Sequence, residues 1–200
     1  MISLEKLLIN FKPINNDEYE GAKMMTNLPF KSKFAYLNII FSAVDTETQR
    51  DIIDPLCLPS QLREFYRIYN GVDLFFDNFN IYGFFPKVYL LERQNFRKRY
   101  PYNIIDINHE YFDDLINNEL FIFGSYYGYD NRSEVFVEKE SGRIWCSVGD
   151  NLRKTRASWP SFEIWLKEEI ARLSECFDEY GHMLVDTEED LLPGGKRLIN

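Results

Sequence analysis

The sequence contains few of the residues on which small secreted domains and metal-binding domains depend. Only three of its 200 residues are cysteine and only two are histidine. The cysteines, Cys57, Cys146 and Cys176, are odd in number and far apart, which argues against a disulfide framework and against a zinc site of the close CxxC type. A reducing, cytoplasmic compartment is the simplest expectation.

Long apolar runs are also missing. No stretch approaches the ~18 apolar residues that a membrane helix needs, so we expect no membrane span. The first thirteen residues, MISLEKLLINFKP, carry Glu5 and lack a basic start and a small-residue cleavage site, so they predict no secretory signal. Apolar residues nevertheless make up 45% of the chain, which is too many for intrinsic disorder. The length fits one domain, or one domain with terminal extensions.

Basic residues are fewer than acidic ones. The chain has 23 Lys and Arg against 32 Asp and Glu, a net charge of −9. Between residues 160 and 190 ten acids are opposed only by Lys167 and Arg172. Such a surface repels phosphate backbones and attracts basic partners, so nucleic acid is not an expected partner. A solvated helix face followed by an acidic tail is the plainer interpretation.

Helical spacing of apolar residues predicts helices in several places. The predicted ranges are 1–12, 31–53, 58–69, 88–99 and 159–177. In the third of them, the apolar side chains from Leu62 to Tyr69 fall at i, i+3, i+4 and i+7, which is one helix face. Gly71 is placed to end that helix in a left-handed conformation. Ser158 or Ser161 can cap the last helix.

Aromatic or alternating segments predict strands between these helices. Residues 72–76 and 79–85 predict a hairpin around Asp77-Asn78, and residues 134–148 predict a second hairpin around Ser141-Gly142. The apolar run at 120–123 is typical of a central strand. Because there is no regular alternation of strand and helix, the pattern favours an α+β domain with an antiparallel sheet.

Four motifs resemble, in this order, those of the SUKH superfamily. They are LPSQLREFYRIYNGV, ELFIFGSYYGYDN, EVFVEKESGRIWC and SWPSFEIWLKEEI. The resemblance covers roughly Thr46 to Phe177. It implies one SUKH-like α+β domain over residues 46–180, with an antiparallel sheet of about four to six strands flanked by helices. A helical N-terminal extension at 1–45 and a C-terminal tail at 181–200 would lie outside that domain.

The resemblance also implies a function, which is binding without catalysis. Most bacterial members look like immunity proteins, encoded beside polymorphic toxins, that bind the toxin domain, often a nuclease, and neutralise it. A fungal member regulates cell-wall synthesis and signalling. Two functions therefore stay open, which are neutralisation of a basic toxin domain and a regulatory protein–protein interaction without a toxin. The members share no catalytic set, so no catalytic residue is carried over.

The residues themselves give no support to a catalytic or metal-binding motif. His109-Glu110 begins like HExxH, but the second histidine position is occupied by Asp113. Ser125 lies in GSYYG, which is not GxSxG. Adjacent carboxylates such as Glu168-Glu169 point about 100° apart on a helix and do not converge on one atom. No catalytic residue, metal or cofactor is predicted, and an enzyme with a noncontiguous site is a third hypothesis.

Acidic and aromatic side chains are the predicted means of partner binding. The chain holds 13 Tyr and 17 Phe, and tyrosine suits protein interfaces, although core packing also explains such a number. Acids of the last helix would steer a basic partner. These acids are Glu168, Glu169, Glu175, Asp178 and Glu179. Residues of the glycine-containing turn would anchor the partner, namely Tyr126, Tyr127, Tyr129 and Asp130.

Overall fold

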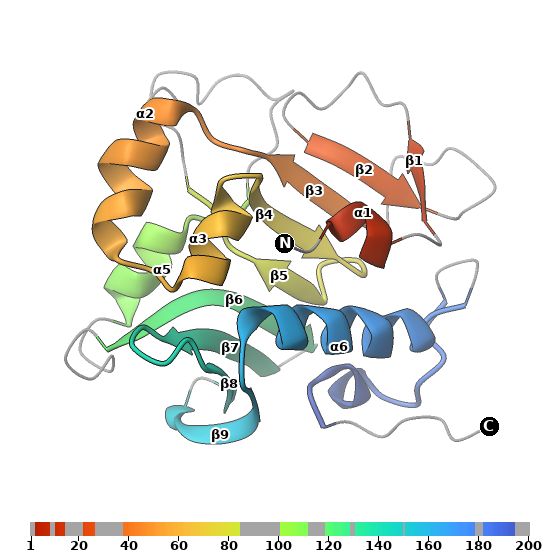
Figure 1. Cartoon of the computed structure of the whole chain (residues 1–200). Helices are drawn as coiled ribbons and strands as arrows, with labels where there is room; N and C mark the ends of the chain where they lie inside the picture. Colours follow the sequence, from red (N-terminus) through yellow and green to blue (C-terminus); the bar gives the residue numbers. More distant parts are fainter. Residues whose placement is uncertain are drawn as a thin grey trace.

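The fold is built on one antiparallel sheet in which each strand pairs with its neighbours in the chain (Figure 1). The computed structural model describes residues 3–8, 11–14, 22–26, 38–84, 101–111, 119–128, 131–149, 151–178 and 182–194. The nine strands are β1 (Lys12–Ile14), β2 (Ala22–Thr26), β3 (Asn38–Ser42), β4 (Tyr69–Leu74), β5 (Phe79–Ile81), β6 (Leu120–Gly128), β7 (Asn131–Glu138), β8 (Ile144–Val148) and β9 (Asn151–Trp159). The α+β class is confirmed, but the sheet has more strands than expected.

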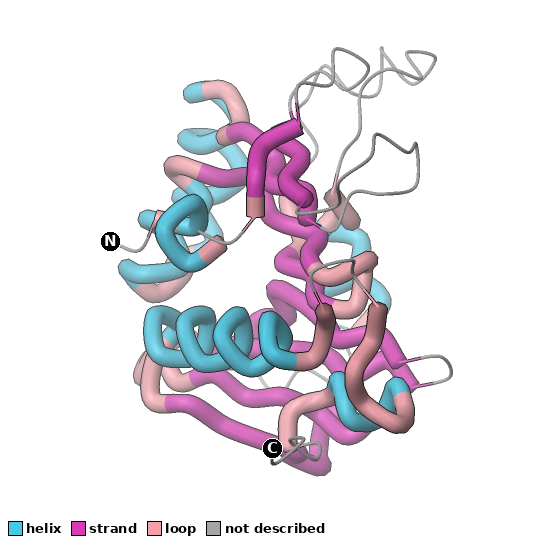
Figure 2. The backbone as a smooth tube through the Cα atoms, turned by 90° about the vertical axis from the view of Figure 1, so that its right-hand side faces the viewer, coloured by secondary structure: helices cyan, strands magenta, loops and turns pink. Residues whose placement is uncertain are grey.

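Helices cover the sheet unequally. They are α1 (Leu4–Leu7), α2 (Thr46–Thr48), α3 (Ser60–Tyr66), α5 (Ile104–Glu110) and α6 (Phe162–Glu175). A π-helical segment, Gln49–Ile53, continues α2, and a short 3-10 helix spans Glu188–Leu191. Figure 2 shows α6 lying in the concave face of the curved sheet, with α1 and α3 on the same side and α5 on the other. None of the helices described is long and apolar enough to cross a membrane.

The core centres on α6, as its apolar stripe predicts. Ser161 caps the helix by accepting a hydrogen bond from the amide of Ile164 at 3.4 Å. Trp165 is buried, and its ring stacks on Phe79 and meets Phe123 edge-on, with both centroid distances 5.1 Å. Aromatic pairs of this geometry add to the free energy gained from burial alone. The last helix therefore fixes the middle strands of the sheet.

The N-terminal region differs from its prediction. Helices are expected at 1–12 and 31–44, but in the described residues of this region only the four-residue α1 is helical, and strands β1 to β3 extend the sheet. Apolar pairs such as Met24-Met25 and Ile39-Ile40 fit either structure, because periodicity does not distinguish short apolar runs. Pairing decides, since Ile40 is aligned with Val72 of β4. The described part of this region is therefore mainly strand and belongs to the sheet.

The helix at 58–69 is shorter than predicted, because α3 ends at Tyr66 and Gly71 lies within β4. Gly71 has a φ of +98°, and a Cβ at this position would lie 2.4 Å from the carbonyl oxygen of Ile81. The glycine is thus required by the close approach of β5, not by a helix end. The preceding Asn70 exchanges two side-chain hydrogen bonds with the backbone of Phe84, at 2.7 and 2.8 Å.

The other predicted elements have separate outcomes. Both hairpins are confirmed, as β4–β5 and β7–β8. The strand predicted at 120–123 forms the first part of the longer β6. The helix expected at 88–99 lies outside the described residues. In the C-terminal tail, Val185, Leu191 and Leu192 are buried, whereas Leu184 is 45% exposed. The described part of the tail is therefore packed against the rest of the protein through these three side chains.

Truncation of the central indole tests this core. We expect Trp165→Ala to lower the free energy of unfolding by about 3–5 kcal/mol, because a buried aromatic ring is replaced by a cavity. The matched control is Ile164→Ala, on the exposed side of the same turn, with an expected loss below about 1 kcal/mol. Urea denaturation measures both, and equal losses would contradict the packing described.

Candidate functional site

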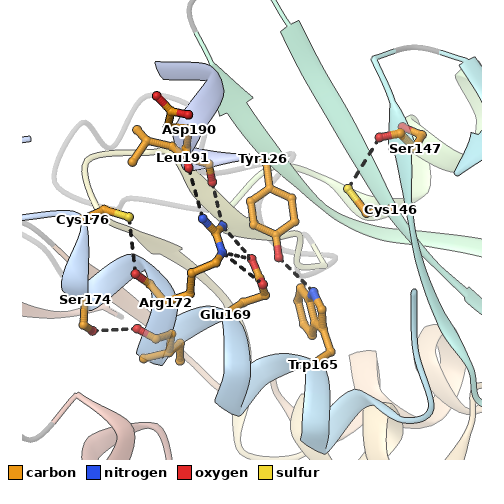
Figure 3. Close-up of polar contacts among 11 residues, drawn as sticks. Tyr126, Cys146, Ser147, Trp165, Glu169, Arg172, Ser174, Cys176, Asp190 and Leu191 are labelled. Carbon is orange, nitrogen blue, oxygen red and sulfur yellow. Dashed lines mark hydrogen bonds and ion pairs between the residues drawn. The ribbon is translucent and has the colours of Figure 1, made fainter. Parts of the chain in front are cut away.

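The two faces of β6 separate the tyrosines that the sequence groups in one turn. Tyr126 is buried, and its hydroxyl accepts a hydrogen bond from Trp165 Nε1 at 3.0 Å (Figure 3). Tyr127 is half-buried and points the other way, because side chains alternate along a strand. Tyr126 therefore cannot be the exposed anchor that the sequence suggests. Tyr129 and Asp130 lie outside the described residues.

The acidic face of α6 is also smaller than predicted. Glu168 and Glu175 are exposed and lie seven residues apart, on one side of the helix. Glu169 is only 4% exposed and belongs to the interior. Asp178 is half-buried beyond the helix end, and Glu179 lies outside the described residues. The exposed acidic face therefore consists of Glu168 and Glu175 in the described part of this region.

Glu169 serves a structural purpose, because it pairs with a buried arginine. Its Oε2 lies 2.7 Å from Arg172 Nη2. The same guanidinium donates to the carbonyl oxygens of Leu191, at 2.7 Å, and Asp190, at 3.3 Å (Figure 3). Burial alone would lower the pKa of Arg172, but hydrogen bonding to Glu169 and its negative charge raise it. The charged pair thus fastens the C-terminal tail to α6.

A row of polar side chains crosses the sheet on the face opposite α6. Asp73 is paired with Asn80 across β4 and β5, and Asn80 in turn with Ser125 of β6. Ser125 is paired with Glu134 of β7, whose amide donates to Ser147 Oγ at 2.8 Å. Residues paired across antiparallel strands share a face. We call this set of five residues the polar row, and all but Asp73 are buried.

Glu134 lies at the centre of a charged cluster at one end of this row. Tyr82 donates its hydroxyl hydrogen to Glu134 Oε2 at 2.9 Å. Arg132 Nε lies 2.5 Å from Oε1, an ion pair that does not meet hydrogen-bond geometry. Arg132 Nη2 also donates to the Tyr82 hydroxyl at 2.6 Å. Burial, and then the Glu134 charge, raise the pKa of Tyr82 well above its ordinary value, so its hydroxyl stays a donor.

Aromatic rings connect this cluster to the surface. The Arg132 guanidinium carbon lies 5.6 Å from the ring centroids of Tyr82 and Tyr127, within the range of a cation–π contact. The rings of Tyr102 and Tyr127 stack with their centroids 6.2 Å apart, and Tyr102 is 44% exposed. Burial, and then the charge of Asp77, raise the pKa of Tyr102. The exposed Tyr102 ring thus joins the buried cluster to the surroundings of Asp77.

A hollow of about 390 Å³ lies beside these rings, between the β4–β5 hairpin and the segment that leads into α5. Carboxylates of Asp73, Asp77 and Asp106 line it, together with the Asn80 amide. Its apolar walls include Phe41 and Val72, and Tyr102 also lines it. We call this feature the acidic hollow. It combines negative charge with apolar walls, which suits a ligand with a cationic end and an aliphatic stem.

Other features of the described residues offer less to a ligand. An apolar groove of about 300 Å³ lies between α3 and the start of α6 and includes Phe65 and Leu166. No group of three or more His, Cys, Asp or Glu side chains within the described ranges could hold a metal ion. Burial raises the pKa of Cys146 and Cys176, which disfavours their nucleophilic thiolates.

Sequence reasoning missed the residues of the polar row and the acidic hollow. Arg132 lies two residues before the predicted strand, but β7 begins at Asn131, so Arg132 and Glu134 share a face and can pair. The predicted turn at Asp77-Asn78 would align Asp73 with Tyr82, whereas the longer turn at residues 75–78 aligns it with Asn80. The sequence did not reveal that this face is largely buried, because its burial depends on how other segments, such as residues 101–111, pack against it.

The buried pair gives a testable energy difference. We expect Arg132→Met to lower the free energy of unfolding by about 3 kcal/mol, because it leaves the Glu134 charge buried without its cation. The double variant Arg132→Met/Glu134→Leu should have a higher free energy of unfolding than the single variant, since no uncompensated charge remains. Urea denaturation at neutral pH compares them. A double variant less stable than the single one would show that the pair is not the source of the loss.

The comparisons with known proteins place this chain in a family. The SMI1 / KNR4 family (SUKH-1) matches residues 55–168, which include the polar row and the acidic hollow apart from Phe41. No curated protein and no solved structure matched the chain at the threshold applied. The family match leaves out β1 to β3 and the C-terminal tail. Because the match covers more than half of the sequence, the chain belongs to the SMI1 / KNR4 family (SUKH-1).

Proposed function

We propose that the chain is a non-enzymatic binding protein that neutralises a cognate toxin domain, such as a nuclease, by direct contact. The observation that carries this proposal is the family match over residues 55–168, since most bacterial members of the SUKH superfamily look like immunity proteins. Its three cysteines are free, which fits action in the reducing cytoplasm of the producing cell.

Charge supports this choice of partner. The chain carries a net charge of −9, whereas a nuclease needs basic residues to hold a phosphate backbone. Opposite charges accelerate association and favour the correct partner over others. Acidic side chains of the immunity protein would occupy the positions that phosphates take in the toxin's substrate groove.

Two acidic features on different parts of the surface suit two different steps of binding, long-range attraction and close contact. Glu168 and Glu175 lie on the outer side of α6 and are exposed, so they suit long-range attraction. The acidic hollow has buried walls and acceptor oxygens, so it suits close contact. Charges on a rim mainly affect the association rate, whereas desolvated contacts mainly affect dissociation.

Co-expression tests the proposal. The full chain is produced together with the C-terminal domain encoded by the neighbouring gene, and growth and complex formation are scored. We expect rescue of growth and a complex that survives size-exclusion chromatography. Absence of both would contradict the proposal. A complex without rescue would favour the regulatory interaction module that the family resemblance also implies.

The α6 acids give a kinetic prediction. Because Glu168 and Glu175 would act through long-range attraction, we expect Glu168→Lys/Glu175→Lys to slow association with the partner domain several-fold at low salt and to leave dissociation nearly unchanged. The difference should fade at high salt, because screening removes it. Surface plasmon resonance measures the rates, and Glu140→Lys, an exposed acid in the β7–β8 turn, is the control. Unchanged association at low salt would show that the α6 surface is not involved.

A further inference from the structure

We propose that the acidic hollow receives an arginine side chain of the protein partner, an inference that rests on the proposed function of partner binding. Buried acceptor atoms without donors, carboxylates, apolar walls and one exposed aromatic ring are brought together there. Each of these features matches a different part of an arginine side chain.

The strongest observation concerns Asn80. Its side chain is only 1% exposed and lines the hollow. Its Nδ2 donates to the carbonyl oxygen of Asp77 at 3.0 Å, but its Oδ1 has no hydrogen-bond partner. Asp77 Oδ1 is likewise buried and without a partner. Buried acceptors without donors cost folding free energy, and a bound donor would remove that cost.

The backbone holds Asp77 at the hollow in an unfavourable conformation. Phe75, Phe76 and Asp77 have φ values of +55°, +57° and +70°. This left-handed region is unfavourable for residues other than glycine. Two side-chain hydrogen bonds hold the start of this turn, since Asn78 Nδ2 donates to the Phe75 carbonyl at 2.7 Å and Asn38 Oδ1 accepts from the Phe75 amide at 3.2 Å. Strain of this kind persists where the surrounding structure enforces it, often at binding sites.

The chemistry of the hollow favours a guanidinium over other cations. Asp73 and Asp106 add negative charge to that of Asp77, while Phe41 and Val72 can pack against a methylene stem. A planar guanidinium offers five donors to separated acceptors and can stack on the exposed Tyr102 ring. A metal ion is a poorer match, because these carboxylates are not among any group that could hold one in the described ranges. The volume of about 390 Å³ lies within the range of small-ligand sites.

A blocked peptide tests the hollow directly in the full chain. The probe is acetyl-Gly-Arg-Gly-amide, titrated into ¹⁵N-labelled protein and followed by NMR. We expect saturable shifts of the Asn80 side-chain NH₂ and of the Asp73 and Asp77 amides, with millimolar affinity. The lysine peptide should bind several-fold more weakly, and the uncharged citrulline peptide should shift none of these signals. Equal binding of the citrulline peptide, or shifts confined to other surfaces, would overturn the proposal.

A charge-removing variant completes the test without disturbing the turn. Asp77→Asn keeps the size of the side chain, and asparagine tolerates the left-handed conformation. We expect it to bind the arginine peptide at least five-fold more weakly than the wild type. The control is Asp186→Asn, an exposed acid in the C-terminal tail, which should bind normally. Unchanged binding by Asp77→Asn would contradict the proposal.

The same variant distinguishes this inference from the proposed function. The complex with the neighbouring gene's domain should weaken at least five-fold in Asp77→Asn and not in Asp186→Asn. If the wild-type complex forms and Asp77→Asn does not weaken it, the hollow is not the contact and the proposed function stands. If the wild type forms no complex, the proposed function fails whatever the peptide does.

Discussion

The packing of α6 against the concave face of the sheet determines how the side chains of the central strands are used. Trp165 contacts Phe79 of β5 and Phe123 of β6 and donates to the Tyr126 hydroxyl. Because alternate residues of a strand point to opposite faces, this contact assigns one face to the apolar core. The neighbouring residues in these strands, such as Asn80 next to Phe79, therefore point to the other face. The position of one helix thus decides which side chains are available to a partner.

The opposite face contains two kinds of buried polar group, with different consequences. Around Glu134, the carboxylate meets a phenol and a guanidinium, and its charge is compensated within the protein. At Asn80 and Asp77, one acceptor oxygen each has no donor. The opposite charges compensate each other in the first cluster, whereas the buried acceptors without donors carry a cost that a bound donor can remove. Because Asn80 and Asp77 both line the acidic hollow, a ligand bound there could supply the missing donors.

The sequence predicted the elements whose signals are local. The stripe of α6 and the two hairpins depend on periodicity and turn residues close together in the chain. The strands β2 and β3 were not predictable in this way, because their apolar runs acquire a strand conformation only by pairing with each other and with β4. Glu169 looked like a surface acid, but it is buried by the distant Leu191 segment. The candidate site was missed for the same reason, since register and covering elements decide which polar residues converge.

Helix α6 closes the core, and we propose that the opposite face, at the β4–β5 turn and the start of α5, receives the partner. Hydrogen–deuterium exchange of the full chain, alone and bound to the toxin domain, tests it most directly. We expect new protection on binding in residues 71–84 and 101–111. Protection confined to α6 and the C-terminal tail would contradict it.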